Sequence, residues 1–258
     1  MNIHLVFASL IEGITEFLPV SSTAHLIIFS KLTQIDLTDT YIKFYLLFIQ
    51  LGALLAGIML FSKKLLTNTK TLTNVCISFV PTAVIGLVLY KLFKKLLEGN
   101  ITLLASVLIL GGLLFMYLEK MYVERSDVKN NIREEIRPWD AFVVGVAQAV
   151  AIVPGVSRSG ATIVAGMFRG IAKAVIVEYT FLLAIPTLGA AVVYDAYKSR
   201  DVLAHIGGGF DLMIGFWLAF ISGYITLVFF KKHLRNISLT AFGWYRIVLG
   251  LSVLFLLY

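Results

Sequence analysis

The sequence is poor in charged residues and in cysteine. Asp, Glu, Lys and Arg make up 14% of the 258 residues, whereas hydrophobic residues make up 59% and the mean hydropathy is +0.90. A soluble globular domain carries about 25% charged and about 45–50% apolar residues, so the composition excludes that class and indicates an integral membrane protein. The single cysteine, Cys76, excludes an intrachain disulfide, and its place in an apolar run predicts a small buried side chain.

The N-terminus also lacks the features of a cleavable signal peptide. No basic segment precedes the first apolar residues, and Glu12 and Glu16 interrupt the apolar stretch that follows. The net charge is nevertheless basic, at +7. In a membrane protein such an excess marks cytoplasmic loops and contacts with anionic headgroups, so we expect the bilayer as a partner and no nucleic acid.

One stretch, residues 12–25, stands out within the apolar N-terminal region. It holds two carboxylates, two serines and a histidine, and Pro19 lies in its middle. Charged groups at membrane depth cost about 2.5–3.5 kcal/mol each on insertion scales. A chain that retains them there usually uses them, so this stretch is the first candidate for function.

The apolar pieces on either side of Pro19 are short. Residues 1–11 and 23–32 each have fewer than the roughly 20 residues needed to span a bilayer, and proline ends the helix before it. Two interpretations follow, a single kinked helix or a re-entrant hairpin that enters and leaves on the same side. Backbone of the second kind is tolerated at depth only when it is buried in protein or lines a wet cavity, and we adopt it as the prediction.

The rest of the chain repeats one pattern of apolar segments. Three full spans are predicted in the first half, over residues 42–61, 75–93 and 101–118. A polar stretch at 119–138 is the candidate linker, and the pattern then restarts with short pieces at 139–153 and 161–170 and spans at 177–194, 212–230 and 241–258. The predicted fold is therefore a single all-α membrane domain, with repeats at 1–118 and 139–258.

Residue matches at offsets of 136 or 137 positions support this repeat. The matched segments are Val20-Ser21 with Val156-Ser157, Leu51-Gly52-Ala53 with Leu188-Gly189-Ala190, Phe93-Lys94-Lys95 with Phe230-Lys231-Lys232, and Asn100-Ile101-Thr102-Leu103 with Asn236-Ile237-Ser238-Leu239. A re-entrant pair plus three spans crosses the bilayer an odd number of times. The two repeats are therefore expected to be inverted, with their interrupted segments meeting near the midplane.

Lysine and arginine positions predict the orientation of this arrangement. With both hairpins re-entrant, thirteen of these residues fall on one side of the membrane and seven on the other. The positive-inside rule makes the richer side cytoplasmic. Both termini are then expected outside.

The two carboxylates of the first motif suggest a cation site. Glu12 and Glu16 are four residues apart, which places them on one face of a helix, one turn from each other. Both can stay ionised at depth if a hard cation such as Mg²⁺ or Ca²⁺ lies between them. A proton shared between the two carboxyl groups is the alternative.

Hydroxyl side chains follow at the start of the next helix. Ser21, Ser22 and Thr23 are typical N-cap residues, and a helix N-terminus presents free N–H groups that suit an anion. His25 lies in the first turn, close to the serines in sequence and downstream of the carboxylates. A lone histidine is more often structural, but this neighbourhood favours a functional role.

The second half contains a similar interruption followed by polar residues, with an arginine in place of the carboxylates. Pro154 and Gly155 interrupt the chain before Ser157, Arg158, Ser159 and Gly160. The guanidinium of Arg158 matches phosphate oxygens, although a salt bridge to Glu12 or Glu16 would also explain it. Gln148 and Thr162 are nearby polar residues that are candidates for the same cavity. Metal, arginine and helix N-termini together suit a phosphate or a diphosphate.

Residues 12–25 (EGITEFLPVSSTAH) and 154–160 (PGVSRSG) resemble the two signatures of the bacterial undecaprenyl-diphosphate phosphatase family, which is linked to bacitracin resistance. Length, span pattern and motif spacing agree over the whole chain, and Ala24 stands where the family commonly has glycine. The resemblance implies hydrolysis of undecaprenyl diphosphate to the monophosphate and inorganic phosphate. This reaction recycles the lipid carrier for peptidoglycan synthesis.

The resemblance also implies roles for individual residues. Glu12 and Glu16 would bind a divalent cation and the diphosphate, Ser22 would be the nucleophile with His25 assisting, and Arg158 would hold the phosphates. Ser21, Thr23, Gln148, Ser157, Ser159, Gly160 and Thr162 would complete the substrate site. Whether Ser22 or His25 attacks, or activates water, stays open.

The expected partners are a polyprenyl diphosphate lipid and the bilayer, with a homodimer left open. The expected location is the bacterial plasma membrane, crossed several times, with the site open to the outer face. A polyprenyl-phosphate transporter or flippase that uses the same anion site is the competing hypothesis, because inverted repeats are frequent in transporters. A purely structural membrane protein would leave the buried charges unexplained.

Overall fold

The computed structural model describes residues 2–97, 100–126, 132–198, 209–233 and 238–257. Within these ranges the chain is helical and contains no strand beyond an isolated bridge between Arg133 and Ile171. Asn236 and Ile237, which belong to the repeat matches, lie outside the described residues, as do Lys129, Arg200 and Arg235, which contribute to the charge count.

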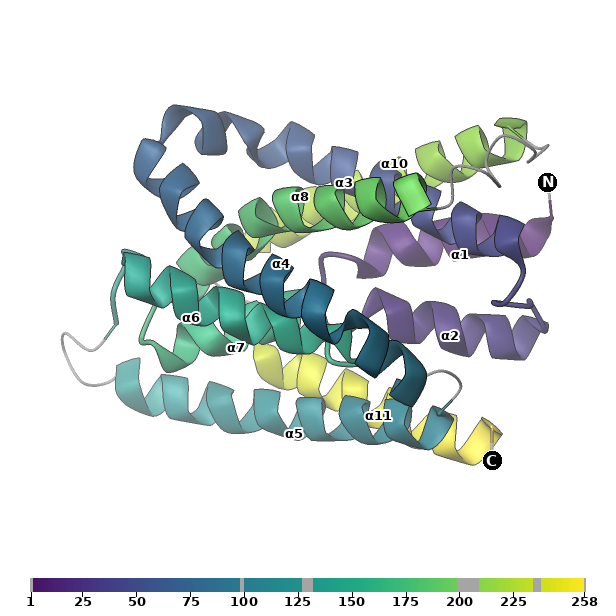
Figure 1. The fold of residues 1–258 in the computed structure, drawn as a ribbon. Helices are drawn as coiled ribbons and strands as arrows, with labels where there is room; N and C mark the ends of the chain where they lie inside the picture. The colour runs from purple at the N-terminus through teal and green to yellow at the C-terminus, as the bar shows by residue number, and fades with distance from the viewer. Residues whose placement is uncertain (1, 98–99, 127–131, 199–208, 234–237, 258) are drawn as a thin grey trace.

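The helices follow the same order in both halves of the chain, two short ones and then longer ones (Figure 1). The first half contains α1 (Ile3–Thr15), α2 (Ser22–Thr33), α3 (Thr40–Thr67), α4 (Thr69–Leu97) and α5 (Ile101–Ser126). The second contains α6 (Pro138–Ala149), the 3₁₀ turn η1 (Val150–Ile152), α7 (Arg158–Phe168), α8 (Lys173–Lys198), α10 (Gly209–His233) and α11 (Leu239–Leu257).

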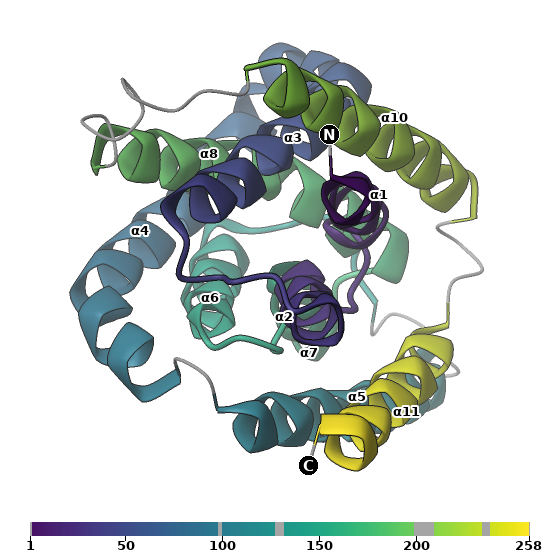
Figure 2. The ribbon, with the colours of Figure 1, turned by 90° about the vertical axis from the view of Figure 1, so that its right-hand side faces the viewer.

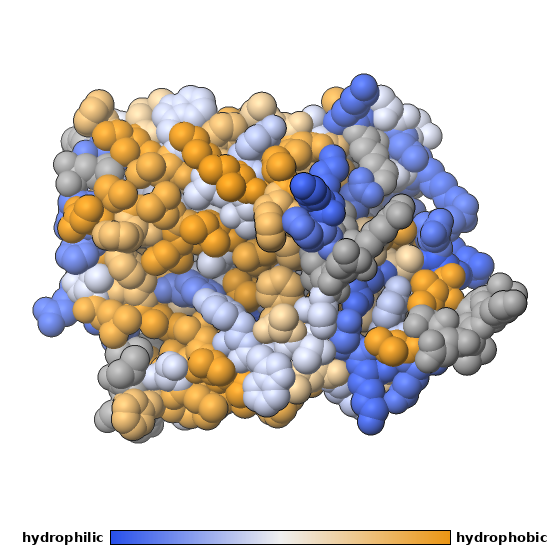
Figure 3. All heavy atoms as spheres, turned by 180° about the vertical axis from the view of Figure 1, so that it is seen from behind, coloured by the Kyte–Doolittle hydropathy of each residue, from blue (hydrophilic) through white to orange (hydrophobic). Residues whose placement is uncertain are grey.

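Five of the described helices, α3, α4, α5, α8 and α10, are long and apolar enough to cross a membrane, judged by length and composition. The sixth predicted span, at 241–258, corresponds to α11, which carries Arg246 in its middle. Pro81 and Pro186 lie inside α4 and α8 without ending them, because neighbouring helices can satisfy the freed backbone groups in such an environment. Apolar side chains cover the middle of the surface in Figure 3, and hydrophilic ones gather at the ends, most densely at one of them.

Two sequence-based expectations differ from the structure in detail. Helix α5 continues through Ser126, so the first part of the predicted linker at 119–138 is helical. Cys76 is exposed on the outer face of α4, so the prediction that it is buried was wrong. An apolar run does not reveal which face of a lipid-facing helix is turned inward, because the bilayer tolerates apolar residues on both faces.

The short helices lie inside a ring of longer ones (Figure 2). Helices α1 and α2 approach from one end of the molecule and α6 and α7 from the other, and the two connecting loops meet in the middle (Figure 1). Helix α1 packs on α10 and α6 packs on α4, while α3 packs on α10 and α5 on α11. This enclosure supplies the protein surroundings that interrupted helices need in an apolar region.

A cluster of aromatic rings anchors the first loop to the surrounding helices. Phe17, in the loop between α1 and α2, contacts the ring of Phe181 on α8 at 5.7 Å between centroids, nearly perpendicular to it. Phe181 in turn contacts Phe61 at 5.3 Å and Phe230 at 5.8 Å. Edge-to-face packing of this kind adds about 0.5–1.5 kcal/mol per pair beyond buried area, so the loop is held by its own apolar residue.

Candidate active site

The centre of the site is the carboxylate of Glu16, the C-cap residue of α1. The hydroxyl of Ser22 donates a hydrogen bond to its Oε2 at 2.5 Å. The Nη2 of Arg158 donates to its Oε1 at 3.1 Å and forms an ion pair with it. One carboxylate therefore joins a serine of the first motif to the arginine of the second, which is 142 positions away.

Local chain geometry places these three groups. Helix α1 ends at Thr15, one turn of chain follows, and Ser21 caps α2 by accepting a hydrogen bond from the Ala24 N–H at 3.3 Å. In the second motif Ser157 caps α7 in the same way, accepting from the Gly160 N–H at 3.2 Å. The side chains that follow each cap, Ser22 and Arg158, then lie at helix N-termini.

The two capping serines share an unusual backbone conformation. Ser21 has φ 71° and Ser157 has φ 72°, a region that non-glycine residues seldom occupy and that costs on the order of 1–3 kcal/mol. They are also the residues that coincide in the sequence repeat. Both helix N-termini are thus turned toward the middle of the molecule by the same local device, and each offers free N–H groups to an anion.

Several charged atoms next to this centre have no hydrogen-bond partner within the described residues. Both carboxylate oxygens of Glu12 are buried and unpartnered, as are the Nε and Nη1 of Arg158. Glu12 is fully buried, and it lies one helical turn before Glu16. A buried unpaired carboxylate is costly, so the surroundings suit a cation beside Glu12 and an anion beside Arg158.

The carboxylates of this site suit a hard divalent cation that takes only some of its ligands from protein side chains. Among the described residues there is no cluster of three or more His, Cys, Asp or Glu, so Glu12 and Glu16 would be the carboxylate ligands. Magnesium is commonly held by one or two carboxylates together with substrate phosphates and waters. The pair Glu12 and Glu16 therefore meets the requirement for such a site.

A cavity of about 300 Å³ adjoins the Glu16 carboxylate. Seven of the residues predicted from the sequence line it, namely Glu16, Ser21, Ser22, Thr23, Gln148, Ser157 and Arg158. Apolar side chains of α8 and of residues 151–154 complete its wall. The volume is at the low end of the range for small-molecule sites and leaves room for a charged headgroup.

Three further polar residues line this cavity and were not predicted. Gln50 lies on α3, Thr82 on α4 and Thr187 on α8, and Thr82 accepts a hydrogen bond from Gln148 at 3.0 Å. The sequence did contain a signal for them. Gln50 and Thr187 directly precede the matched segments 51–53 and 188–190, and Thr82 and Thr187 each follow the proline inside a span.

Five predicted residues do not line the cavity: Glu12, which is fully buried, and the four whose contacts follow. His25 is turned away: its Nδ1 pairs with the Ser21 carbonyl at 2.8 Å, and its Nε2 pairs with the Tyr245 hydroxyl at 2.6 Å. Ser159 donates to the Leu18 carbonyl at 2.9 Å, and Thr162 pairs with Thr180 at 2.8 Å. Gly160 faces the ring of Phe115. These residues support the two loops on the side away from the cavity.

Arg246, on α11, is a further buried charge next to the two loops, and it was not predicted as a site residue. It is fully buried and donates to carbonyl oxygens of both loops, those of Pro19, Gly155 and Val156. The available signal was its position as the only charged residue of α11, since a charge at membrane depth is seldom without a role.

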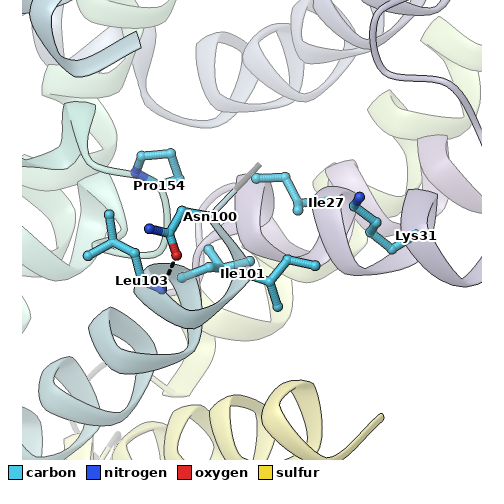
Figure 4. Close-up of a pocket in the computed structure, with 7 residues that line it drawn as sticks. Ile27, Lys31, Asn100, Ile101, Leu103 and Pro154 are labelled. Atoms are coloured by element: carbon cyan, nitrogen blue, oxygen red, sulfur yellow. Dashed lines mark hydrogen bonds between the residues drawn. The ribbon is translucent and has the colours of Figure 1, made fainter. Parts of the chain in front are cut away.

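A smaller cavity of about 40 Å³ lies beside α2 and the start of α5 (Figure 4). Lys31 and Asn100 line it, and the Asn100 side chain caps α5 by accepting from the Leu103 N–H at 2.9 Å. The lining contains no carboxylate and no hydroxyl nucleophile. The cavity next to Glu16 is the candidate site for chemistry, because residues of both motifs line it.

Comparison with known proteins agrees with this geometry. Residues 5–252 match the family model described as Bacitracin resistance protein BacA. A protein of Aquifex aeolicus named undecaprenyl-diphosphatase is 40% identical over 252 residues, covering 95% of this chain and 94% of its own. A protein of the same name from Sulfurihydrogenibium sp. is 40% identical over 250 residues, covering 97% of this chain and 97% of its own. Another, from Campylobacter jejuni subsp. jejuni, is 38% identical over 257 residues, covering 100% of this chain and 95% of its own.

Proposed function

The chain belongs to the Bacitracin resistance protein BacA family, and we propose from this membership and from the site that it is an undecaprenyl-diphosphatase. It is a multi-pass membrane hydrolase that converts undecaprenyl diphosphate to undecaprenyl phosphate and inorganic phosphate. The monophosphate is the lipid carrier for cell-wall synthesis, and its recovery confers bacitracin resistance. The observation that carries the proposal is Glu16, whose two oxygens bind the Ser22 hydroxyl and the Arg158 guanidinium.

The fold we propose for this function consists of two inverted repeats, each a re-entrant helix pair followed by three membrane-crossing helices. Three features support it. The two short-helix pairs approach from opposite ends (Figure 1), the α1–α10 contact has its counterpart in the α6–α4 contact, and the capping serines repeat in sequence and conformation. In this fold both helix N-termini face one anion from opposite leaflets.

We propose that Ser22 attacks the terminal phosphorus of the diphosphate. Its proton passes to Glu16, which holds the hydroxyl at 2.5 Å, and then to the departing phosphate oxygen as the bond from phosphorus to the bridging oxygen breaks. Undecaprenyl phosphate leaves, and the phosphoryl group stays on Ser22. Water then attacks that phosphorus, gives its proton through Glu16 to the Ser22 oxygen, and inorganic phosphate leaves. A nucleophile hydrogen-bonded to a base that a third group orients is the usual arrangement for this chemistry.

The other charged groups neutralise the phosphates. Arg158 has two unpartnered donors, Nε and Nη1, besides the one that binds Glu16, and a guanidinium fork suits phosphate oxygens. Glu12 and Glu16 would hold the divalent cation, Mg²⁺ or Ca²⁺. When bound, such a cation offsets phosphate charge and orients the headgroup. Ser21, Thr23, Gln148 and Ser157, together with Gln50, Thr82 and Thr187, would contact the headgroup from the cavity wall.

We assign a supporting role to four of the predicted residues that lie outside the cavity. His25 assists the reaction by binding the Ser21 carbonyl and so holding the loop that presents Ser22. Ser159, Gly160 and Thr162 keep α7 against the first loop. The site is proposed to open to the outer face of the plasma membrane, as the resemblance to the family implies, and the distribution of lysine and arginine predicts that both termini lie outside.

The test is phosphate release from a lipid diphosphate by the purified protein. We expect turnover with Mg²⁺ or Ca²⁺, loss of turnover with a chelator, and loss in Glu16→Gln and Arg158→Ala. Glu124→Gln, which changes an exposed carboxylate at the end of α5, is the matched control and should retain activity. Trapping a phosphoryl group on Ser22 would support the covalent step, and turnover by Ser22→Ala would exclude it. Binding of the lipid without turnover by the unmodified protein would favour a polyprenyl-phosphate transporter instead.

A further inference from the structure

The largest side chain that is fully buried in the described chain belongs to Arg246, in the middle of the apolar helix α11. The hydrogen bonds of its guanidinium go to backbone carbonyls, and its Nε has no partner among the described residues. Burying a charge in this way is expensive. The positions of the carbonyls that accept its hydrogen bonds indicate the role of this charge.

These carbonyls belong to the two loops of the site. Nη1 donates to the carbonyl of Pro19 at 3.3 Å and to that of Val156 at 3.1 Å. Nη2 donates to the carbonyl of Gly155 at 2.7 Å. Pro19 lies two residues before Ser21, and Val156 lies directly before Ser157. One side chain therefore joins the segments that lead into both capping serines.

The backbone conformation of both segments has to be held by contacts with the rest of the protein. Each ends at a serine with φ above 70°, and such conformations persist only where the surroundings over-determine them. Each also leads directly to a residue of the catalytic centre, Ser22 in one case and Arg158 in the other. A shift of either loop would change how these two groups meet at Glu16.

Helix α5 holds the guanidinium in place. The Arg246 guanidinium carbon lies 5.1 Å from the centroid of the Phe115 ring, within the range of a cation–π contact. The carbonyl of Val107 accepts from Nη2 at 3.5 Å. Gly111 leaves the necessary space, because a methyl group there would overlap Nη2. The planar fork of arginine can donate to several carbonyls at once, which lysine cannot do in the same geometry.

We propose that Arg246 is a positioning residue that locks the two active-site loops to each other. It sets the distance between Ser22 on the first loop and Arg158 on the second, and it does not touch the substrate. The activity readout of this proposal rests on the proposed phosphatase function. A readout of loop motion does not rest on it.

The first experiment compares Arg246→Met and Arg246→Lys with the unmodified protein, in material that stays monodisperse in detergent. We expect kcat to fall by about 10- to 100-fold in Arg246→Met, since misplacing reacting groups by about 1 Å costs this much. The KM and the pH profile should change little, because each charged group that meets substrate is still present. Arg246→Lys should recover part of the lost kcat, since it restores the charge and some of the donors.

The second experiment displaces the guanidinium without removing its charge. Gly111→Ala should lower kcat, while Gly86→Ala is the matched control, because a methyl group at Gly86 meets nothing closer than Ile152 Cδ1 at 4.0 Å. If Arg246→Met does not fold, the kcat of Gly111→Ala tests the proposal instead. Folded Arg246→Met or Gly111→Ala with a kcat within about twofold of the unmodified protein would overturn the proposal.

Amide hydrogen exchange separates this proposal from the proposed function. Exchange in residues 17–25 and 153–160 should become faster in Arg246→Met and in Gly111→Ala, and it should be unchanged in Gly86→Ala. If the unmodified protein shows no turnover, the proposed phosphatase function is wrong. The exchange data alone then test whether Arg246 holds the two loops together. Unchanged exchange in both loops of Arg246→Met would exclude the lock whatever the activity.

Discussion

At the scale of single residues, two glutamates one turn apart have opposite surroundings. Both oxygens of Glu16 are engaged, one by Ser22 and one by Arg158, whereas both oxygens of Glu12 are buried and have no hydrogen-bond partner in the part of the chain that the structure describes. Glu16 is therefore placed to accept the Ser22 proton. The cation role proposed for Glu12 rests on its burial, because an unpaired carboxylate in an apolar region gains most from a counter-ion.

This difference predicts different kinetics for the two amide variants. Glu16→Gln should lower kcat by about 10²- to 10⁴-fold, the usual contribution of a general base. Glu12→Gln should mainly raise the Mg²⁺ concentration needed for half-maximal activity. Steady-state assays over a Mg²⁺ titration measure both effects, with Glu124→Gln as control. Equal losses in the two variants at saturating Mg²⁺ would contradict the division of roles.

His25 permits a second test at the residue scale. Its ring binds the Ser21 carbonyl and stacks against Tyr245, with centroids 5.6 Å apart and planes 8° from parallel. His25→Asn keeps a donor near the position of Nδ1 but has no group that titrates near neutral pH. We expect it to retain most of kcat, and His25→Ala to lose more, since only the first preserves the bond to the loop. A loss of 10²-fold or more in His25→Asn would instead indicate general acid–base catalysis.

At the scale of elements, the start of α6 is tied to the turn between α7 and α8. Arg133 pairs by its backbone with Gly170 and Ala172, at 2.8 and 2.7 Å. The buried carboxylate of Asp140, in the first turn of α6, accepts from Arg133 Nη1 and from Arg169 Nε, both at 2.8 Å. This tie closes the hairpin of α6 and α7 at the end opposite its catalytic loop.

The tie predicts a pH-dependent contribution to stability. Burial alone would raise the pKa of Asp140, which lies outside the five helices long enough to span, but hydrogen bonds from Arg133, Arg169 and the Arg137 backbone lower it to about 2. A carboxyl whose pKa is depressed by folding stabilises the fold above its unfolded pKa of about 3.9, and this stability is lost as the pH falls toward 2.

Thermal melts of the unmodified protein and Asp140→Asn should therefore differ at pH 7 and converge between about pH 4 and pH 2. The comparison is made as a difference between the two proteins, so that other acid effects cancel. Glu124→Gln, which changes an exposed carboxylate near the end of α5, controls for the loss of a negative charge. A difference that persists undiminished at pH 2 would show that Asp140 acts by packing alone.

At the scale of the whole molecule, a polar site lies in the middle of an apolar protein. The ring of long helices surrounds the short ones (Figure 2), so the interrupted backbone and the buried charges meet protein and cavity instead of lipid. The apolar surface band of Figure 3 is what this arrangement presents to a bilayer. The predicted excess of lysine and arginine on one side of the membrane favours the orientation proposed above.

Orientation can be tested with single cysteines in a Cys76→Ser background. Thr38 precedes α3 and Thr69 begins α4, so the length of α3 separates them, and both are exposed. In intact cells a membrane-impermeant maleimide should label Thr38→Cys and spare Thr69→Cys, and both should react after permeabilisation. The reverse pattern would place the site on the cytoplasmic side. Labelling of both in intact cells would show that α3 does not span.

The sequence alone determined the class of the protein, its helical composition, the two motifs and most of the polar residues of the cavity wall. These properties are local. Hydropathy decides which segments suit a bilayer, and proline and serine decide where a helix ends and the next begins. A charge in an apolar run marks a candidate site wherever it lies.

Only the tertiary structure decided which groups meet. It paired Arg158 with Glu16 and left Glu12 free, turned His25 toward Tyr245, added Gln50, Thr82 and Thr187 to the wall, and placed Arg246 between the loops. These contacts join residues up to 227 positions apart. Which side of a helix faces inward depends on how helices pack, and in an apolar environment the hydrophobic pattern does not record it, because lipid and protein interior are equally apolar.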